Sequence, residues 1–258
     1  MKPNITVVKL GGNCMDNPDL LHSFLASFSK MEGPKVLVHG GGKMATQLGQ
    51  KLGIPVQMIE GRRVTCVETL KIVTMTYAGL INKELVTKLQ TLNCNAVGIS
   101  GLDGNLILSQ KRASETIDYG FVGDPSVVDP TLLVTLLEAG FVPVVAPITH
   151  NVHGQLLNTN ADTVASFIAA SLTEKYNVHL LYAFDKKGVL ENANDDNSVI
   201  PNLSKSLSEK LKSEDKIAGG MHPKLQAGYS ALKNNVTRVT IQHLASLDSD
   251  AVSTTLEL

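Results

Sequence analysis

The sequence predicts an α/β fold in which helices cover both faces of a mainly parallel sheet. Apolar segments of strand length alternate with amphipathic helical segments along the 258 residues, an order that produces parallel strands joined by helices. Residues 5–10 and 35–38 form two such strands, and each runs into glycines that open a helix. Hydrophobic residues make up 43% of the chain and charged residues 18%, a balance typical of a folded globular protein.

The first helix has a distinct start signal. Asn17 is a favoured N-cap residue, and Pro18 is favoured at the first helical position. Apolar residues then recur at helical spacing as far as Phe28. We therefore predict a helix from Pro18 that buries one face, then the strand at 35–38 and a second helix ending near Leu52.

The same alternation continues to the end of the chain. Asp103-Gly104-Asn105 is a turn signal between apolar segments and suggests a small hairpin. The remaining predicted helices span residues 67–91, 130–139, 162–172, 204–211 and 223–233, and the remaining predicted strands span residues 96–99, 142–148, 179–184 and 238–242.

Composition narrows the class of function. The formal net charge of −1 gives no overall basic field for nucleic acid, so local groups must hold any anionic ligand. Cys14, Cys66 and Cys94 lie far apart and outside metal or disulfide motifs, so we expect small buried or half-buried thiols in a reducing compartment. The sequence contains neither a signal peptide nor an apolar run of membrane-spanning length. These features predict a soluble, cytoplasmic protein.

Two glycine turns point to an anion-binding site at neighbouring strand ends. The segments KLGG at 9–12 and HGGG at 39–42 let backbone N–H groups approach a phosphate. Lys9 is a charged residue within an apolar strand, which favours a functional role. The G-x-G-x-x-G fingerprint is absent, and Met44 stands where a P-loop needs Ser or Thr. Dinucleotide-binding and P-loop folds are therefore disfavoured.

Motifs in order along the chain resemble those of the N-acetylglutamate kinases, a branch of the amino acid kinase superfamily. Their order and spacing extend from residue 9 to residue 224, so the resemblance covers most of the chain. The motifs are KLGGN at 9–13, HGGG at 39–42, GRRVT at 61–65, GISGLDG at 98–104, GFVGD at 120–124, AGFVPVVAPI at 139–148, LNTNAD at 157–162, DKKGV at 185–189 and GGMHPK at 219–224.

The resemblance implies an open αβα sandwich and a specific reaction. In that reaction ATP phosphorylates the side-chain carboxylate of N-acetyl-L-glutamate, a step of arginine biosynthesis, with Mg²⁺ accompanying the nucleotide. A single domain, residues 1–258, would contain an N-terminal lobe for the acyl amino acid, about residues 1–175, and a C-terminal lobe for ATP, about residues 176–258. Because a carboxylate is already ionised at neutral pH, its attack on ATP needs positioning and charge stabilisation rather than a general base.

Site residues follow from the same resemblance, position by position. Lys9 and Lys224 would neutralise the transferring phosphoryl group, and Asp162 would orient both lysines. Judged alone, Lys224 next to Pro223 would be expected in solvent, and only the motif at 219–224 favours a catalytic role. No protein ligand is expected for the metal. Substrate binding is assigned to Gly41, Gly42, Arg63, Asn158 and Asn160, and nucleotide binding to Gly11, Gly12, Asp185, Gly188 and Ile217.

Some positions depart from the family pattern and leave alternatives open. Arg62 replaces an apolar residue and Thr149 a glycine near the substrate motifs, so N-succinyl-L-glutamate or another N-acylated acidic amino acid remains an alternative substrate. Phe184 stands where Thr or Ser is common. Other rivals are a kinase for another small acid within the superfamily and a non-catalytic nucleotide-binding regulator, which the presence of all three catalytic residues disfavours.

The start of the chain bears on assembly and regulation. Arginine-inhibited members of the family carry an extra N-terminal helix that builds hexamers, and no such helix precedes Ile5. We therefore expect a homodimer that arginine does not strongly inhibit.

Overall fold

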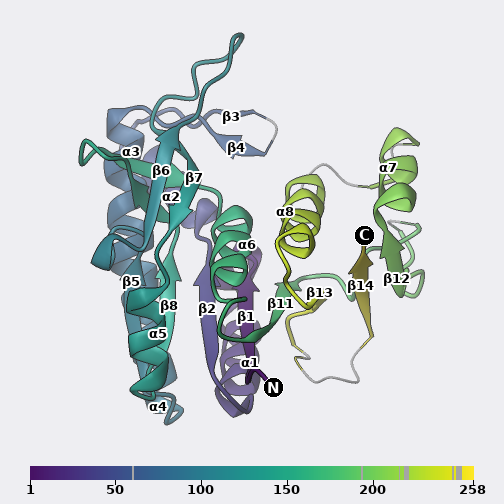
Figure 1. Ribbon diagram of the computed structural model, residues 1–258. Helices are drawn as coiled ribbons and strands as arrows, with labels where there is room; N and C mark the ends of the chain where they lie inside the picture. Colours follow the sequence, from purple (N-terminus) through teal and green to yellow (C-terminus); the bar gives the residue numbers. More distant parts are fainter. Residues whose placement is uncertain (60, 193, 215, 218–220, 246, 248–251) are drawn as a thin grey trace.

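The computed structural model describes residues 1–59, 61–192, 194–214, 216–217, 221–245, 247 and 252–258. Gly219 and Gly220, part of the motif that precedes Lys224, lie outside these residues. The described chain forms the predicted α/β sandwich, with helices in front of and behind one large sheet (Figure 1). None of the described helices combines the length and the apolar character needed to cross a membrane.

The central sheet has eight strands: β1 (Asn4–Leu10), β2 (Lys35–His39), β5 (Ala96–Ser100), β8 (Val142–Ala146), β11 (Asn177–Phe184), β12 (Asn202–Ser204), β13 (Arg238–His243) and β14 (Ser253–Glu257). Their spatial order is β12-β14-β13-β11-β1-β2-β8-β5. All neighbours are parallel except β13 and β14, which confirms a mainly parallel sheet. Because β1 pairs with β11, the sheet continues across the predicted lobe boundary, and the division into lobes stays a prediction.

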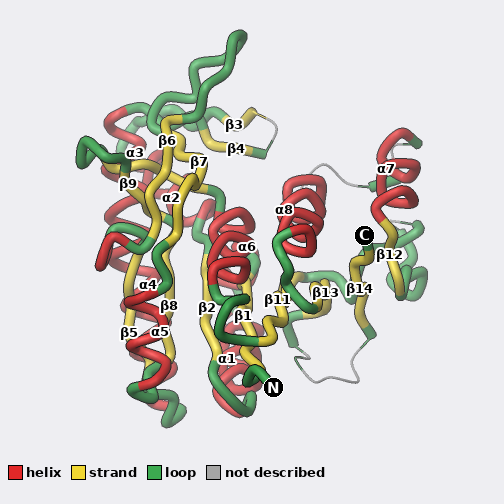
Figure 2. The backbone as a smooth tube through the Cα atoms, viewed as in Figure 1, coloured by secondary structure: helices red, strands yellow, loops and turns green. Residues whose placement is uncertain are grey.

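The two layers of helices are α1 (Pro18–Lys30), α2 (Gly42–Lys51), α3 (Val67–Val73), α4 (Asn82–Thr91), α5 (Thr131–Glu138), α6 (Ala161–Ser171), α7 (Lys205–Ser213) and α8 (Met221–Lys233). Side chains alternate along each strand, so the sheet has a separate hydrophobic core on each face. Val7 packs in the core with α5 to α8, whereas Val8 packs in the core with α1 to α4. Figure 2 shows the strands in yellow between helices in red.

Local signals in the sequence account for several helix boundaries. The side chain of Asn17 accepts a hydrogen bond from the N–H of Leu20 at 3.1 Å, and Pro18 is the first residue of α1, as predicted. The helix predicted at 67–91 is continuous, but a π-helical turn, η2 (Thr74–Ile81), separates α3 from α4. This turn was not predicted, and it positions one wall of the pocket described below.

The hairpin predicted at 103–105 is wrong. A 3-10 turn, η3 (Asp103–Asn105), instead leads the chain out of the main sheet, with Gly104 at φ 58°. The predicted strand 142–148 is likewise divided at Pro147, which lacks the N–H that a central strand needs. The strands that follow these two breaks join a small closed barrel of β6 (Ile107–Lys111), β7 (Val122–Val128), β9 (Ile148–His150) and β10 (Leu156–Thr159).

The cysteines are free thiols, but they are not all buried as predicted. Cys14 and Cys94 are buried, whereas Cys66 is exposed. The Sγ atom of Cys66 accepts a hydrogen bond from the N–H of Thr69 at 3.5 Å at the start of α3. This cysteine therefore caps a helix rather than filling the core.

Candidate active site

The candidate site lies where neighbouring parallel strands end. Strands β11, β1, β2 and β8 are parallel neighbours, so their carboxyl ends share one edge of the sheet. Lys9 is the penultimate residue of β1 and lies opposite Tyr182 of β11 in the register. By strand alternation, Lys9 points to the same face as Val7, the face that α6 and α8 cover.

Lys9, Asp162 and Lys224 form one buried ionic cluster. The Nζ atoms of Lys9 and Lys224 lie 2.8 Å and 3.0 Å from the same oxygen, Oδ1 of Asp162. Asp162 stands in the first turn of α6 and Lys224 in α8, so the cluster joins two helices to the sheet. Lys224 is only 3% exposed, and the expectation from its immediate neighbours, a solvated lysine, is wrong. The structure brings together all three residues predicted to be catalytic.

The cluster carries one positive charge in excess. Burial alone would raise the pKa of Asp162, but the two ammonium groups outweigh burial and hold this pKa below its ordinary value. Burial lowers the pKa of Lys224 to about 8, and the charge of Lys9 acts in the same direction, while Asp162 opposes both. At neutral pH one carboxylate therefore faces two ammonium groups. This arrangement suits an incoming anion such as a phosphoryl group.

Two aromatic rings hold Lys224 from the β11 side. Its Nζ atom lies 5.1 Å from the ring centre of Tyr182 and 5.4 Å from that of Phe184, within the range of cation–π attraction. The hydroxyl of Tyr182 donates to the backbone oxygen of Asp162 at 3.4 Å. Phe184, a departure from the family pattern, thus packs against a predicted catalytic lysine.

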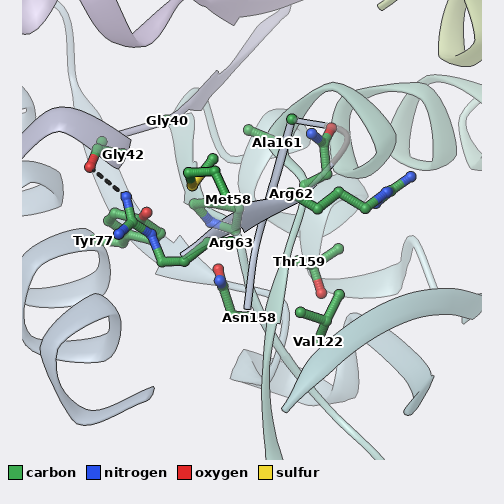
Figure 3. A pocket seen from close by; sticks show the side chains of 14 residues that line it. Gly40, Gly42, Met58, Arg62, Arg63, Tyr77, Val122, Asn158, Thr159 and Ala161 are labelled. Atoms are coloured by element: carbon green, nitrogen blue, oxygen red, sulfur yellow. Dashed lines mark hydrogen bonds between the residues drawn. The ribbon is translucent and has the colours of Figure 1, made fainter. Parts of the chain in front are cut away.

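A pocket of about 150 Å³ adjoins the N-terminus of α6. Its walls are the glycine turn 40–42, the segment at the short strands β3 (Met58–Ile59) and β4 (Arg62–Arg63), Tyr77, and the end of β10 through Ala161 (Figure 3). Ala161 directly precedes Asp162, so the pocket adjoins the ionic cluster. Among its described lining residues are two arginines and no acidic side chain, as a pocket for an anion requires.

Arg63 is fixed at one wall of this pocket. Its Nη2 atom donates to the backbone oxygen of Gly42 at 2.7 Å and to Oγ1 of Thr46 at 2.8 Å (Figure 3). The N–H of Thr65 donates to Tyr119 O at 3.0 Å, which ties the Arg63 segment to the loop before β7. Arg63 is therefore 7% exposed and held on both sides.

The two predicted asparagines have different surroundings. Asn158 is 8% exposed, and its Nδ2 donates to Oγ1 of Thr65 at 3.0 Å, so it faces the Arg63 segment. Asn160 lines the pocket, but its Oδ1 also accepts the N–H of Thr163 at 3.1 Å as the N-cap of α6. The prediction of substrate binding for Asn160 therefore missed this structural role, which the helix predicted to begin at residue 162 could have indicated.

The two departures near the substrate motifs occupy different places. Arg62 lines the pocket, and Figure 3 shows its side chain extending away from that of Arg63. Thr149 is fully buried, and its Oγ1 lies 2.8 Å from Oγ1 of Thr159, which lines the pocket. Arg62 thus lies at the pocket itself, whereas Thr149 is connected to the pocket through Thr159.

The glycines predicted to face substrate and phosphate divide into two groups. Gly41 is the N-cap of α2, and Gly42 is its first residue, so Gly42 N–H belongs to the donors that a helix start leaves without helical partners. The N–H of Gly11, however, donates to Ala183 O at 3.0 Å. This N–H is therefore paired within the structure, and phosphate binding by Gly11 stays a prediction. Gly12 opens a 3-10 turn, η1 (Gly12–Asp16), and remains the candidate donor.

The predicted nucleotide-binding residues lie beyond the end of β11. Asp185 is exposed directly after β11. A Cβ atom at Gly188 would lie 2.6 Å from Oγ1 of Thr254, so close packing on β14 explains the glycine. Ile217 is 6% exposed and packs in the core that includes Leu225. Nucleotide contacts by these three residues stay a prediction.

His39 has a structural role beneath the glycine turn. The ring is fully buried, with Nδ1 2.9 Å from Gly40 O and Nε2 3.2 Å from Nδ2 of Asn82. Burial lowers the pKa of His39 to about 4. A neutral histidine fixed in this way supports the glycine turn and does not serve as a base.

Sequence comparison assigns the family. The profile of the amino acid kinase family matches residues 4–243. The chain belongs to the amino acid kinase family. It is 50% identical over 242 residues to the acetylglutamate kinase of Cytophaga hutchinsonii, covering 93% of this chain and 92% of that one. It is 46% identical over 250 residues to the acetylglutamate kinase of Bacteroides fragilis, covering 97% and 96% of the two chains.

A solved structure agrees with this family assignment. The crystal structure of smu.665 from Streptococcus mutans UA159 superposes with a TM-score of 0.81 and 25% sequence identity, covering 97% of this chain and 98% of that one. The αβα sandwich is therefore the amino acid kinase fold, as predicted, and the relatives place the chain in the acetylglutamate kinase branch.

Three residues of this amino acid kinase site were not predicted. Thr46 holds Arg63, Tyr77 lines the pocket, and Tyr182 contacts both Lys224 and Asp162. The two tyrosines lie within apolar segments, so the sequence does not distinguish them from ordinary core residues. Thr46 follows the HGGG turn by one helical turn, the one signal that could have identified it.

Proposed function

We propose that this protein transfers the γ-phosphoryl group of ATP to the side-chain carboxylate of N-acetyl-L-glutamate, a step of arginine biosynthesis. The product is N-acetyl-L-glutamyl 5-phosphate. The observation that carries the proposal is the cluster in which Lys9 and Lys224 share Oδ1 of Asp162 beside an arginine-lined pocket. Relatives at 50% and 46% identity over nearly the full length, both named acetylglutamate kinase, support it.

The reaction joins an ionised carboxylate to phosphorus. A carboxylate oxygen forms a bond to the γ-phosphorus of ATP, the bond from that phosphorus to the β,γ-bridging oxygen breaks, and ADP leaves. Lys9 and Lys224 stabilise the charge on the transferring group, because their ammonium groups are already fixed by Asp162 before ATP arrives. Fixed donors need no reorganisation during the transfer.

The pocket orients the acyl amino acid for this attack. The reacting carboxylate belongs near Ala161 and the glycine turn, where Gly42 N–H is available at the start of α2. Arg63 and Asn158 then hold the α-carboxylate and the groups around it. In this orientation the reacting end of the substrate lies toward Ala161 and its amino-acid end lies toward Arg63, which fixes the reacting oxygen for in-line attack.

Mg²⁺ enters as part of the MgATP substrate. The described residues contain no group of three His, Cys, Asp or Glu side chains suited to a metal ion, and Asp162 is already paired with two lysines. Phosphate oxygens and water are therefore the ligands expected for Mg²⁺, which commonly keeps several waters when bound to a nucleotide. The protein contributes Lys9 and Lys224 to the same phosphates.

A hydroxylamine trap tests the reaction. The protein is incubated with MgATP, N-acetyl-L-glutamate and hydroxylamine, and the hydroxamate formed from the acyl phosphate is measured. Hydroxamate that depends on both substrates is expected. Hydroxamate from free glutamate but not from any N-acylated form would assign the protein to another branch of the superfamily. If no acid gave hydroxamate, the kinase assignment would be rejected.

A second candidate substrate is N-succinyl-L-glutamate, and Arg62 is the observation that favours it. A succinyl group carries one more carboxylate than an acetyl group, and the pocket contains one more arginine than the α-carboxylate needs. The same trap with both substrates decides between them. A larger kcat/KM for the succinyl substrate that falls in Arg62→Leu would favour this candidate, whereas preference for the acetyl substrate unaffected by Arg62→Leu would exclude it.

Assembly and location are further parts of the proposal. We propose a homodimer in the cytoplasm. The helical segment from α3 to α4 supports a self-association surface, since Val67, Met75 and Leu80 are 47%, 56% and 50% exposed.

A further inference from the structure

Tyr77 is a buried residue that reaches the substrate pocket from the π-helical turn η2. It is 5% exposed, and it lines the pocket together with Arg63 and the glycine turn. A Cβ atom added at Gly41 would lie 2.8 Å from Cδ1 of Tyr77 and would also meet Ile81. The missing side chain of Gly41 therefore makes room for the Tyr77 ring, which packing holds in one position.

The guanidinium group beside this ring lacks a carboxylate within the described residues. Arg63 donates to two neutral oxygens, of Gly42 and Thr46, and forms no ion pair among the residues that the structure describes. Burying an arginine without a counter-charge is unfavourable, and a guanidinium group has five N–H donors to satisfy. An anionic ligand at the Arg63 wall would remove this cost.

The phenol of Tyr77 lies at the same wall. Figure 3 shows the Tyr77 side chain beside the Arg63 guanidinium group, across the pocket from Ala161. Burial raises the pKa of Tyr77, while the charge of Arg63 and a side-chain hydrogen bond from Arg63 to the phenol oxygen oppose this effect. The phenol is therefore protonated at neutral pH and is able to donate a hydrogen bond to an anion that Arg63 holds.

We propose that Tyr77 is a substrate-binding residue whose hydroxyl donates a hydrogen bond to the α-carboxylate held by Arg63. The inference rests on the proposed function, and it deepens that function by naming a second group that recognises the amino-acid end of the substrate. Because the reacting carboxylate lies toward Ala161, next to Asp162, the α-carboxylate is the one left for Arg63 and Tyr77. The π-helical turn then serves to bring a tyrosine to this wall.

The substitution Tyr77→Phe tests the hydrogen bond while keeping the ring that packs beside Gly41. A hydrogen bond to a charged group is lost, so KM for N-acetyl-L-glutamate is expected to rise about 10-fold or more. We expect kcat and KM for ATP to stay unchanged, because the interaction is the same in the ground and transition states. Tyr176→Phe is the matched control: Tyr176 is 8% exposed and belongs to the main core, and its loss of a hydroxyl is expected to change none of these constants.

A substrate without the α-carboxylate separates binding from packing. N-acetyl-4-aminobutyrate keeps the amide and the reacting carboxylate, and it is measured as a substrate or, through its Ki, as a competitive inhibitor. For this analogue we expect Tyr77→Phe and the unsubstituted protein to be equal. If Tyr77→Phe raised KM or Ki equally for both compounds, or left KM for N-acetyl-L-glutamate unchanged, the inference would be overturned. The proposed function would still stand. Failure of the unsubstituted protein to phosphorylate N-acetyl-L-glutamate would instead reject the proposed function and this inference together.

Discussion

At the scale of single residues, the shared oxygen of Asp162 determines what each lysine does. Lys9→Met and Lys224→Met each remove one ammonium group from the position of the transferring phosphoryl group. We expect each to lower kcat by about 100-fold or more, as removal of a donor to a developing anion does elsewhere. Steady-state kinetics with saturating MgATP and acyl-glutamate measure the change, and KM is expected to change much less than kcat.

The control for both lysine variants is an exposed lysine. Lys212 is exposed on α7, so Lys212→Met is expected to keep near-normal turnover. Near-normal turnover in Lys224→Met would exclude a mechanism with two lysines, even if Lys9→Met were inactive. Thermal unfolding of each variant shows whether a loss of activity follows from a loss of folding.

A pH profile tests the charge on Lys224. Its folded pKa is lowered to about 8, below the ordinary value of about 10.4, so the ammonium form is lost as pH rises through about 8. If this form stabilises the phosphoryl group, kcat/KM for ATP falls on the alkaline side with a midpoint near that pKa, because this constant reports the free enzyme. A profile that stays flat to pH 10 would contradict the prediction.

Residue context limited how much of the site could be predicted. Lys9 stood out because a charge in an apolar strand is rare. Lys224 could not be recognised in this way, because it reaches Asp162 only when α8 packs against α6. Tyr77 and Tyr182 are aromatic residues in apolar segments, and nothing in the sequence distinguishes a buried ring that contacts a ligand or a lysine from one that only fills the core.

At the scale of elements, the packing of η2 on the glycine turn supports the pocket. In Gly41→Ala the new methyl group would meet Tyr77 and Ile81, and overpacking of this kind costs about 1–3 kcal/mol. We expect a lower free energy of unfolding in urea and a raised KM for the acyl substrate. Gly79→Ala is the matched control, because Gly79 has no atom within 4 Å of an added Cβ and alanine favours a helix. Equal stability of the two variants would exclude a packing role for Gly41.

Some secondary-structure elements could be predicted from the sequence, and others could not. Apolar runs predict six strands of the central sheet, β1, β2, β5, β8, β11 and β13, and the Asn17-Pro18 signal predicts the start of α1. The barrel was missed because its closure depends on pairings between strands that are not consecutive in the sequence, those of β10 with β7 and of β6 with β9. Strand β14 was missed because Ser253, Thr254 and Thr255 make it mostly polar, and only its pairing with β12 and β13 reveals it.

At the scale of the whole molecule, the homodimer is the assembly to test. The exposed side chains on the segment from α3 to α4 would be covered in a dimer, so Leu80→Arg is expected to shift the protein toward monomer. Leu52→Arg is the control, because Leu52 is 57% exposed at the end of α2 and outside the proposed surface. Gel filtration with light scattering measures the mass. A hexamer, or a dimer unaffected by Leu80→Arg, would contradict the proposal.

The family assignment also belongs to the whole molecule. The αβα sandwich and the family could be predicted because motifs were spread from residue 9 to residue 224 and kept their order. The ionic cluster draws on both halves of the chain, with Lys9 from the first and Asp162 and Lys224 from the second. No single segment of the sequence predicts that these three groups meet. Their contact follows only from the family resemblance or from the fold itself.

Oxygen transfer tests the central claim most directly. N-acetyl-L-glutamate labelled with ¹⁸O in its side-chain carboxylate is incubated with the protein and MgATP, and the acyl phosphate is cleaved with hydroxylamine at its carbonyl carbon. The released phosphate then keeps the bridging oxygen. If the carboxylate attacks the γ-phosphorus, mass spectrometry finds one ¹⁸O in each phosphate derived from the acyl phosphate. Release of only unlabelled phosphate, or absence of hydroxamate, would contradict the claim that this protein phosphorylates the carboxylate of an acyl-glutamate.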